Sequence, residues 1–304
     1  MYPYLNLGPV HLGMFGLLLW LAAVVATVAL HKNFARNGVD ADALNVVALA
    51  MVLGIVGAKV WHELENVREL QIALLLIARP GWHHPIDVGL GFLQWFRDGF
   101  AWFGGLSAGI AVLLINGHFA RFKGPGWKSI DDPGPVPGAR VGAIRMLDLA
   151  APAAAIGYGV GRIGCLLAGD GDYGINTTLP WGVHMAKNAL VPPIPPTAMV
   201  QPTPIYELLF SLVVFWLLWQ LGKRTGSGSA RPVGWLTGLY LLLAGIGRFL
   251  VEFVRINPKL YFHHTMSNAQ VAAAASAIVG LMVLGIAQAR HAEWAPRLAA
   301  EARA

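Results

Sequence analysis

Long apolar runs separated by shorter polar segments dominate the chain. Seven of the runs have the length of a helix that crosses the hydrocarbon core of a bilayer, about 17–25 residues. They are predicted at 12–31, 44–62, 101–118, 147–167, 205–222, 234–254 and 269–289. The pattern therefore predicts an all-α, polytopic membrane protein with about seven transmembrane helices.

Two of the intervening segments are too long to be simple turns. Segment 63–100 mixes tryptophans with an apolar stretch, which indicates either an outer arm lying on the membrane interface or an extracellular loop. Segment 168–204 is polar and rich in proline, and we interpret it as a small head outside the bilayer or as a lid. We expect a single seven-helix membrane domain over 1–290 and a cytoplasmic tail over 291–304.

Lysine and arginine are shared unevenly between the two sides of this topology. Thirteen lie on the side of the 32–43 loop and six on the other side, and cytoplasmic loops carry the excess of basic residues. This distribution predicts an N-terminus outside and a C-terminus in the cytoplasm. The remaining three basic residues lie near the predicted outer ends of their spans, and they are Lys59, Arg162 and Arg248.

Composition agrees with this class of protein and excludes several others. Hydrophobic residues make up 56% of the chain and charged residues 12%, which is more apolar than a soluble domain of this length. The net charge of +6 does not indicate nucleic-acid binding, because the basic residues form no stripe with aromatic residues. The only cysteine, Cys165, excludes a disulfide framework. Without HExxH or paired CxxC spacing, we expect no metal and no cofactor.

The run Gly161-Arg162-Ile163-Gly164 carries the strongest functional signal. An arginine in lipid is costly unless it faces a cavity or a partner, so Arg162 is a candidate site residue. No carboxylate lies three or four residues away on the same helix. Its counter-charge is therefore expected from Asp170, Glu207, Glu252 or an anionic ligand.

A second charged group lies in the sixth span. Arg248, Glu252 and Arg255 are spaced i, i+4 and i+7, which predicts that they share one face of a helix. The alternative is an ion pair that has no function beyond structure. Because a guanidinium offers a planar fork to phosphate oxygens, several arginines at this depth indicate a bound phospholipid headgroup, either for chemistry or as a structural lipid.

Weaker signals lie nearby. Tyr206 and Glu207 open the fifth span, where the tyrosine is either an interface anchor or part of the site. Gly105 and Gly109 have the spacing that lets two helices approach closely, although Gly104 with Gly105 would also leave room for a ligand. We interpret Cys165 as a small hydrophobic residue rather than a nucleophile.

Taken together, these motifs resemble the bacterial prolipoprotein diacylglyceryl transferase family. The matching motifs follow the family's order over nearly the whole chain: Gly8-Pro9-Val10, Gly57-Ala58-Lys59, Gly104-Gly105-Leu106, Asp148 to Pro152, Gly161-Arg162-Ile163-Gly164, Pro202 to Glu207, Arg248 to Arg255, and Ser267 with Gln270. The motif around Arg162 in the fourth span and the motif from Arg248 to Arg255 in the sixth would each be weak alone, but together they are specific for the family.

The resemblance implies a multi-pass enzyme of the bacterial inner membrane with its active site toward the periplasmic face. Such an enzyme transfers a diacylglyceryl group from phosphatidylglycerol to the lipobox cysteine of preprolipoproteins and releases glycerol phosphate. Its partners would be phosphatidylglycerol, lipobox peptides and membrane lipids, without nucleic acid, and 168–204 would be a periplasmic head. The alternative is a phospholipid-binding or transport protein on the same scaffold.

The resemblance also implies roles for individual residues. The expected catalytic set is Arg162, Arg248 and Glu252, with the two arginines on the donor's phosphate. The expected substrate-binding set is Lys59, Gly104, Gly105, Asp170, Tyr206, Glu207 and Arg255.

The chain departs from the family at several positions. Phe103 replaces a histidine or tyrosine, Cys165 an asparagine, Lys59 an arginine, and Gln201 a frequent histidine. The segment from Gly169 to Gly174 is one residue longer than usual. These departures predict a divergent member, in which Phe103 cannot act as a proton acceptor.

Overall fold

The computed structural model describes residues 4–8, 10–79, 84–97, 99–123, 138, 140–185, 191–195, 197–222 and 231–301. The chain forms two compact units, Met1–Ala43 with Gly117–Ala304 and Leu44–Asn116, each considered by itself. Seven described helices are long and apolar enough to cross a membrane: α1 (Met14–Asn37), α2 (Ala43–Glu65), α5 (Trp102–Phe119), α6 (Ala143–Ala168), α7 (Thr203–Leu221), α8 (Trp235–Val251) with the short 3₁₀-helix η1 (Glu252–Val254), and α9 (Asn268–Glu301). The prediction of a polytopic all-α protein is confirmed.

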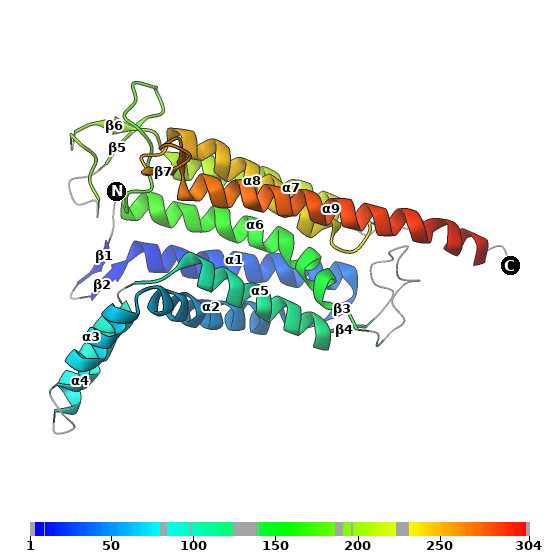
Figure 1. The fold of residues 1–304 in the computed structure, drawn as a ribbon, viewed down its shortest axis with the longest axis horizontal. Helices are drawn as coiled ribbons and strands as arrows, with labels where there is room; N and C mark the ends of the chain where they lie inside the picture. The colour runs from blue at the N-terminus through cyan, green and yellow to red at the C-terminus, as the bar shows by residue number, and fades with distance from the viewer. Residues whose placement is uncertain are drawn as a thin grey trace. The chain divides into compact units, whose positions relative to one another are not determined.

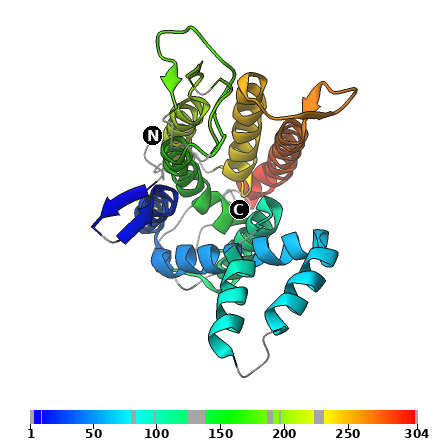
Figure 2. The ribbon, with the colours of Figure 1, turned by 90° about the vertical axis from the view of Figure 1, so that its left-hand side faces the viewer.

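The first unit is a bundle in which α6 is the central helix. Helix α6 packs against α1, α7 and α8, and α8 packs in turn against α7 and α9 (Figures 1 and 2). Its core includes buried aliphatic residues of α6, α7 and α8, namely Ala151, Ala155, Val214, Leu218 and Leu236. The small side chains of α6 let its neighbours approach closely, which fixes the ends of α6, α7 and α8 relative to one another.

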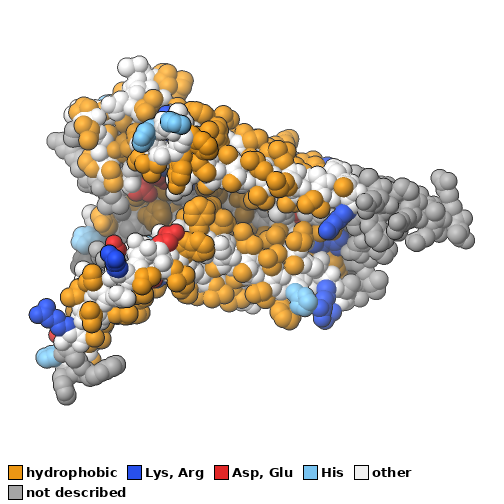
Figure 3. Space-filling model, in the orientation of Figure 1, with side chains coloured by type: hydrophobic (Ala, Val, Ile, Leu, Met, Phe, Trp, Pro, Cys, Tyr) orange, Lys and Arg blue, Asp and Glu red, His pale blue; other side chains and the backbone are white. Residues whose placement is uncertain are grey.

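The outward faces of the helices are largely hydrophobic on the side shown in Figure 3. Large apolar side chains such as Leu209, Trp216 and Leu281 are each more than half exposed. Exposed apolar surface of this extent is unfavourable in water and favourable against acyl chains. It agrees with the placement of these helices in a membrane.

Two helices continue beyond the ends that hydropathy predicts. Helix α1 runs past residue 31 to Asn37, because its polar side chains find partners on neighbouring helices. The amide of Asn33 donates to the Leu149 carbonyl at 2.6 Å, and Nη1 of Arg36 donates to the Trp219 carbonyl at 2.8 Å. Helix α9 continues through the predicted tail to Glu301, and residues 302–304 lie outside the described residues.

Among the described residues, four short antiparallel strand pairs that hydropathy does not predict lie outside the helices. They are β1 (Tyr4–Leu7) with β2 (Val10–Gly13), β3 (Val39–Asp40) with β4 (Arg121–Phe122), β5 (Val183–His184) with β6 (Met199–Val200), and β7 (Lys259–Tyr261) with β8 (Met266–Ser267). Strands of two to four residues are too short to show a periodicity. The β5 and β6 pair lies within the described part of 168–204.

In the second unit, the described part of 63–100 includes two helices that lie side by side, α3 (Val67–Ala78) and α4 (Pro85–Arg97) (Figure 1). Lys59 of α2 is buried and holds this pair, since its Nζ donates to the Trp95 carbonyl at 2.6 Å and lies 2.8 Å from Glu63. Leu75 and Ile86 are more than 70% exposed. An arm on the membrane interface remains a prediction that these exposed apolar residues support.

Helices α2 and α5 approach most closely at glycines. A Cβ atom on Gly104 would lie 2.2 Å from the Gly57 carbonyl oxygen, and one on Gly105 would lie 3.3 Å from that of Gly54. Nothing lies within 4 Å of a Cβ on Gly109. The close approach is therefore made at 104 and 105, and not at the predicted pair 105 and 109.

This contact leads to a prediction. Gly104→Ala is expected to lower the free energy of unfolding by about 1–3 kcal/mol, because the methyl group forces two helix backbones apart. Gly109→Ala on the same helix is the matched control and should unfold at the wild-type denaturant concentration. Denaturant unfolding of the purified protein in detergent measures both. Equal behaviour of the two variants would contradict the contact.

Candidate active site

Three helix ends in the first unit bring charged side chains together. Helix α6 ends at Ala168 and is followed by Gly169, whose φ of 63° is left-handed and whose N–H donates to the Cys165 carbonyl at 3.0 Å. Helix α7 begins with a proline in its first turn, where the missing N–H costs nothing. Helix α8 passes into η1 at Glu252. Arg162, Glu207 and Arg248 therefore meet at one end of the bundle.

Glu207 lies at the centre of the charged group, with a side chain only 3% exposed. Its Oε2 accepts from Nε of Arg162 at 2.7 Å and also contacts Nη2 of that residue. Its Oε1 accepts from Nη1 of Arg248 at 2.7 Å and from the Tyr158 hydroxyl at 2.7 Å. One carboxylate thus fixes the two arginines that the sequence singled out, and it is one of the counter-charges considered for Arg162.

Glu252 links the same group to the start of α9. Nη2 of Arg248 lies 3.0 Å from its Oε2, while its Oε1 accepts from Oγ of Ser267 at 2.8 Å and from the amide of Asn257 at 2.6 Å. Ser267 also caps α9, because its Oγ accepts from the backbone N–H of Gln270, and Oε1 of Gln270 accepts from the N–H of Ser267. The helix cap and the site are therefore one hydrogen-bond network.

Arg255 departs from the predicted helix face. Helix α8 ends at Val251, and after η1 the backbone at Arg255 is extended, with φ of −86° and ψ of 158°. Proline at 258 disfavours continuation of the helix. Arg255 instead forms a backbone bridge with Gly174, its guanidinium contacts Asp172, and its Nη1 lies 3.5 Å from Glu207. The i, i+4 pair of Arg248 and Glu252 forms as predicted.

Three arginines and three carboxylates are thus ion-paired in this part of the described structure, the third carboxylate being Asp172. Mutual pairing and hydrogen bonding offset the cost of removing these charges from water. The side chains of Arg162 and Arg248 are 13% and 26% exposed, whereas that of Arg255 is 3% exposed. Arg162 and Arg248 are therefore the two more exposed arginines of the group, and Arg255 is buried with Asp172 in contact with its guanidinium.

Other predicted site residues form no ion pair with the three arginines among the described residues. The Tyr206 hydroxyl accepts a hydrogen bond from Nε1 of Trp181 at 2.7 Å. Asp170 forms no ion pair with Arg162 among the described residues, where Asp172 takes that position. Lys59, Gly104 and Gly105 belong to the second unit, and their part in substrate binding stays a prediction.

Sequence reasoning missed Tyr158 and Asp172 as members of the group. Tyr158 lies four residues before Arg162 on α6, so it shares a helix face with it, and this spacing was the available signal. Asp172 follows two glycines with left-handed backbone, Gly169 and Gly171, so no helical spacing relates it to Arg162. Its place depends on long-range bonds, such as the one from Oγ1 of Thr203 to its carbonyl at 2.6 Å.

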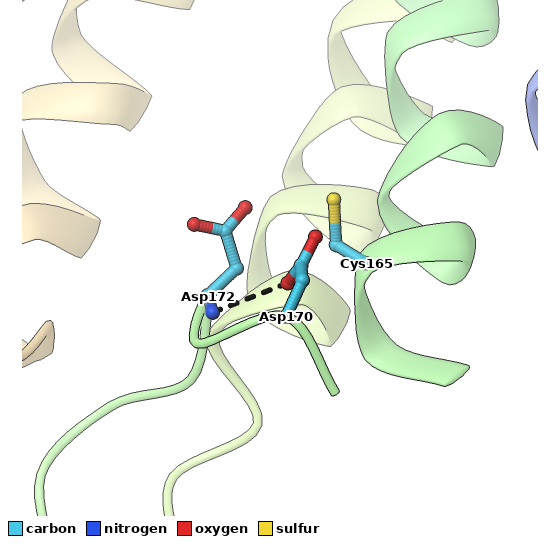
Figure 4. Close-up of side chains that lie close together, drawn as sticks. All are labelled: Cys165, Asp170 and Asp172. Atoms are coloured by element: carbon cyan, nitrogen blue, oxygen red, sulfur yellow. Dashed lines mark hydrogen bonds between the residues drawn. The ribbon is translucent and has the colours of Figure 1, made fainter. Parts of the chain in front are cut away.

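Cys165, Asp170 and Asp172 offer ligand atoms that lie within 4.8 Å of one another (Figure 4). Nη1 of Arg162 lies 3.4 Å from Sγ of Cys165 and 2.6 Å from Oδ2 of Asp172, so a permanent positive charge already occupies this group. A cation is disfavoured there. Burial, followed by the charge of Asp172, raises the pKa of Asp170. Burial would raise the pKa of Asp172 as well, but Arg162 and Arg255 outweigh it and hold that pKa below its ordinary value.

A family model described as prolipoprotein diacylglyceryl transferase matches residues 3–286. The chain belongs to this family. A phosphatidylglycerol–prolipoprotein diacylglyceryl transferase of Clostridium tetani is 28% identical over 275 residues, which cover 90% of this chain and 92% of that protein. Relatives of the same description in Clostridium perfringens (numbered 2) and Bordetella avium are 28% and 29% identical, and the matches cover 81% and 83% of this chain and 79% and 80% of the relatives.

Membership of the diacylglyceryl transferase family confirms the resemblance on which the sequence analysis relied. The matched residues include every helix end that builds the charged site. The chain is therefore a multi-pass membrane member of that family, with Arg162 and Arg248 held on one carboxylate.

Proposed function

We propose that the protein transfers a diacylglyceryl group from phosphatidylglycerol to the cysteine thiol of a prolipoprotein and releases glycerol phosphate. The observation that carries the proposal is the pair formed by Arg162 and Arg248, both held by Glu207 and both partly exposed. An anionic headgroup at the end of membrane helices is the ligand that two such guanidinium groups fit best. Relatives named for this reaction match the chain over most of its length.

The reaction consists of one bond exchange at the donor. The acceptor thiol loses its proton, its sulfur bonds to the glyceryl carbon that carries the phosphate ester, and the carbon–oxygen bond breaks. The electron pair of that bond stays on the phosphate oxygen, and the thiol proton passes to the solvent or to the released glycerol phosphate. Arg162 and Arg248 would stabilise the negative charge that develops on the leaving phosphate.

The arginines of the site would also assist the acceptor. A free thiol has a pKa of about 8.5, so only a few per cent is thiolate at neutral pH, and nearby arginines favour the thiolate. Phe103 stands where the family has a histidine or tyrosine, so this side chain supplies no base. The acceptor would be a lipobox cysteine of a secreted prolipoprotein, with membrane lipids around the donor.

The distribution of basic residues supports a location in the inner membrane with the C-terminus in the cytoplasm. In that orientation the charged ends of α6, α7 and α8 face the periplasm, where secreted prolipoproteins arrive. The described part of 168–204 then forms a periplasmic head beside the site.

Genetic complementation tests the proposed function. In a strain depleted of its own diacylglyceryl transferase, the wild-type gene should restore growth, and Arg248→Ala at equal protein level should not. Rescue by both proteins would contradict the assignment of Arg248. Absence of rescue by the wild type, with phospholipid binding that depends on Arg162, would favour a lipid-binding protein instead.

A further inference from the structure

Asp172 differs from the other two paired carboxylates in its exposure. Its side chain is 28% exposed, whereas those of Glu207 and Glu252 are 3% and 1% exposed. Its two oxygens also meet two different guanidinium groups, because Oδ2 lies 2.6 Å from Nη1 of Arg162 and Oδ1 contacts Nη2 of Arg255. Asp172 is therefore the carboxylate that is both accessible and shared between two arginines.

The backbone of Asp172 is held independently of its carboxylate. Its carbonyl accepts from Oγ1 of Thr203, and the next residues are fixed by bonds from the Gly174 N–H to the Gln201 carbonyl and from the Ile175 N–H to the Val254 carbonyl, each at 2.8 Å. A side chain attached to a fixed backbone can change rotamer without unfolding its segment. The carboxylate can therefore leave the arginines while the loop stays in place.

The position that this carboxylate occupies has the requirements of a phosphate site. Two N–H groups from different guanidinium groups converge on it, which suits two oxygens of a phosphodiester, and the side chains of Arg162 and Asp172 are 13% and 28% exposed. We define the anion position as the space between Nη1 of Arg162 and Nη2 of Arg255. In the structure, Asp172 fills it.

We propose that Asp172 is an internal competitor for the anion position, which the donor's phosphate enters by displacing the Asp172 carboxylate. The inference deepens the proposed function and rests on it for the identity of the donor. After transfer, the carboxylate returns to the arginines as glycerol phosphate leaves. Asp172 sets how tightly the site holds an anion, and it is a positioning residue rather than a catalytic one.

The competition has a definite consequence for affinity. Asp172→Asn removes the competing charge and leaves three arginines with two carboxylates, so one positive charge of the group is uncompensated. Glycerol 1-phosphate and inorganic phosphate are expected to bind about tenfold more tightly, and the KM for phosphatidylglycerol should fall by a similar factor. Since tighter binding of donor and product alike does not stabilise the transition state selectively, kcat should stay level or fall.

The experiment uses the full chain, purified in detergent, with glycerol 1-phosphate and inorganic phosphate as probes in calorimetric titrations, and steady-state kinetics with phosphatidylglycerol. Asp172→Ser is the second variant, and Asp40→Asn is the matched control, because Asp40 is an exposed carboxylate that pairs with Lys123 at 2.8 Å. The control should bind both probes with wild-type affinity.

Tighter anion binding in Asp172→Asn and Asp172→Ser supports the proposal. Unchanged or weaker binding in both would overturn it, and so would the failure of both variants to fold, because a displaceable anion cannot be essential for folding. A wild-type protein without transfer activity would count against the proposed function, while the comparison of anion affinities would still decide the role of Asp172.

Discussion

Arg162→Lys is expected to lower kcat/KM for phosphatidylglycerol about 10²–10³-fold, the range that follows the loss of one preorganised donor to a developing negative charge. Arg162 contacts Glu207 through Nε and Asp172 through Nη1, both within 2.7 Å, so its fork spans two carboxylates. A lysine keeps the charge but presents it at one point and cannot reach both. The guanidinium would then be lost at the position where the leaving phosphate needs it.

Steady-state kinetics with purified protein and a lipobox peptide measure this effect. The matched control is Arg121→Lys, since Arg121 is exposed and donates to the Gly138 carbonyl at 2.9 Å. The control should retain the wild-type kcat/KM. If Arg162→Lys loses less than about threefold in this comparison, the phosphate is not held by Arg162 in the transition state.

The second large effect is on stability. Glu207→Gln is expected to lower the free energy of unfolding by about 3–5 kcal/mol, the usual result of removing one partner from a buried ion-pair network. The Glu207 carboxylate contacts Arg162, Arg248 and Arg255 and is nearly inaccessible to solvent. A neutral amide would leave their positive charges poorly compensated at the end of a membrane helix bundle.

Denaturant unfolding in detergent micelles measures the loss, with Glu65→Gln as the control. Glu65 accepts from Nε1 of Trp61 at 2.8 Å and belongs to an exposed hydrogen bond. Its replacement should change the free energy of unfolding by no more than about 0.5 kcal/mol. Wild-type stability in Glu207→Gln would show that the arginines are not held by this carboxylate.

The sequence was sufficient to predict the membrane helices and to identify Arg162 and Arg248 as site residues. A charge inside an apolar span needs a partner, and that reasoning led to Arg162, Arg248 and Glu207, which the structure brings into direct contact. The ends of the helices are predicted less well, because hydropathy does not take account of polar side chains that bond to neighbouring helices. Hydropathy ended α1 at residue 31, but Asn33 and Arg36 continue the helix by bonding to carbonyls of α6 and α7.

The rest of the site depends on contacts that no periodicity encodes. Arg255 was expected on the face of α8, yet the helix ends before it, and the residue pairs with Gly174 across a backbone bridge. Asp170 and Asp172 lie in the same glycine-rich loop, and their positions in the sequence do not show which of them contacts the arginines. Long-range bonds of the loop, such as those to Thr203 and Gln201, hold Asp172 beside the arginines.

The transfer of the diacylglyceryl group can be measured directly with purified components. Purified protein is incubated with phosphatidylglycerol labelled in its headgroup glycerol and with a peptide that contains one lipobox cysteine. We expect a peptide whose mass has increased by the diacylglyceryl group on sulfur, together with an equal amount of labelled glycerol phosphate. Both should be lost in Arg162→Ala. Labelled lipid that binds to the folded wild-type protein but yields neither product would contradict the account.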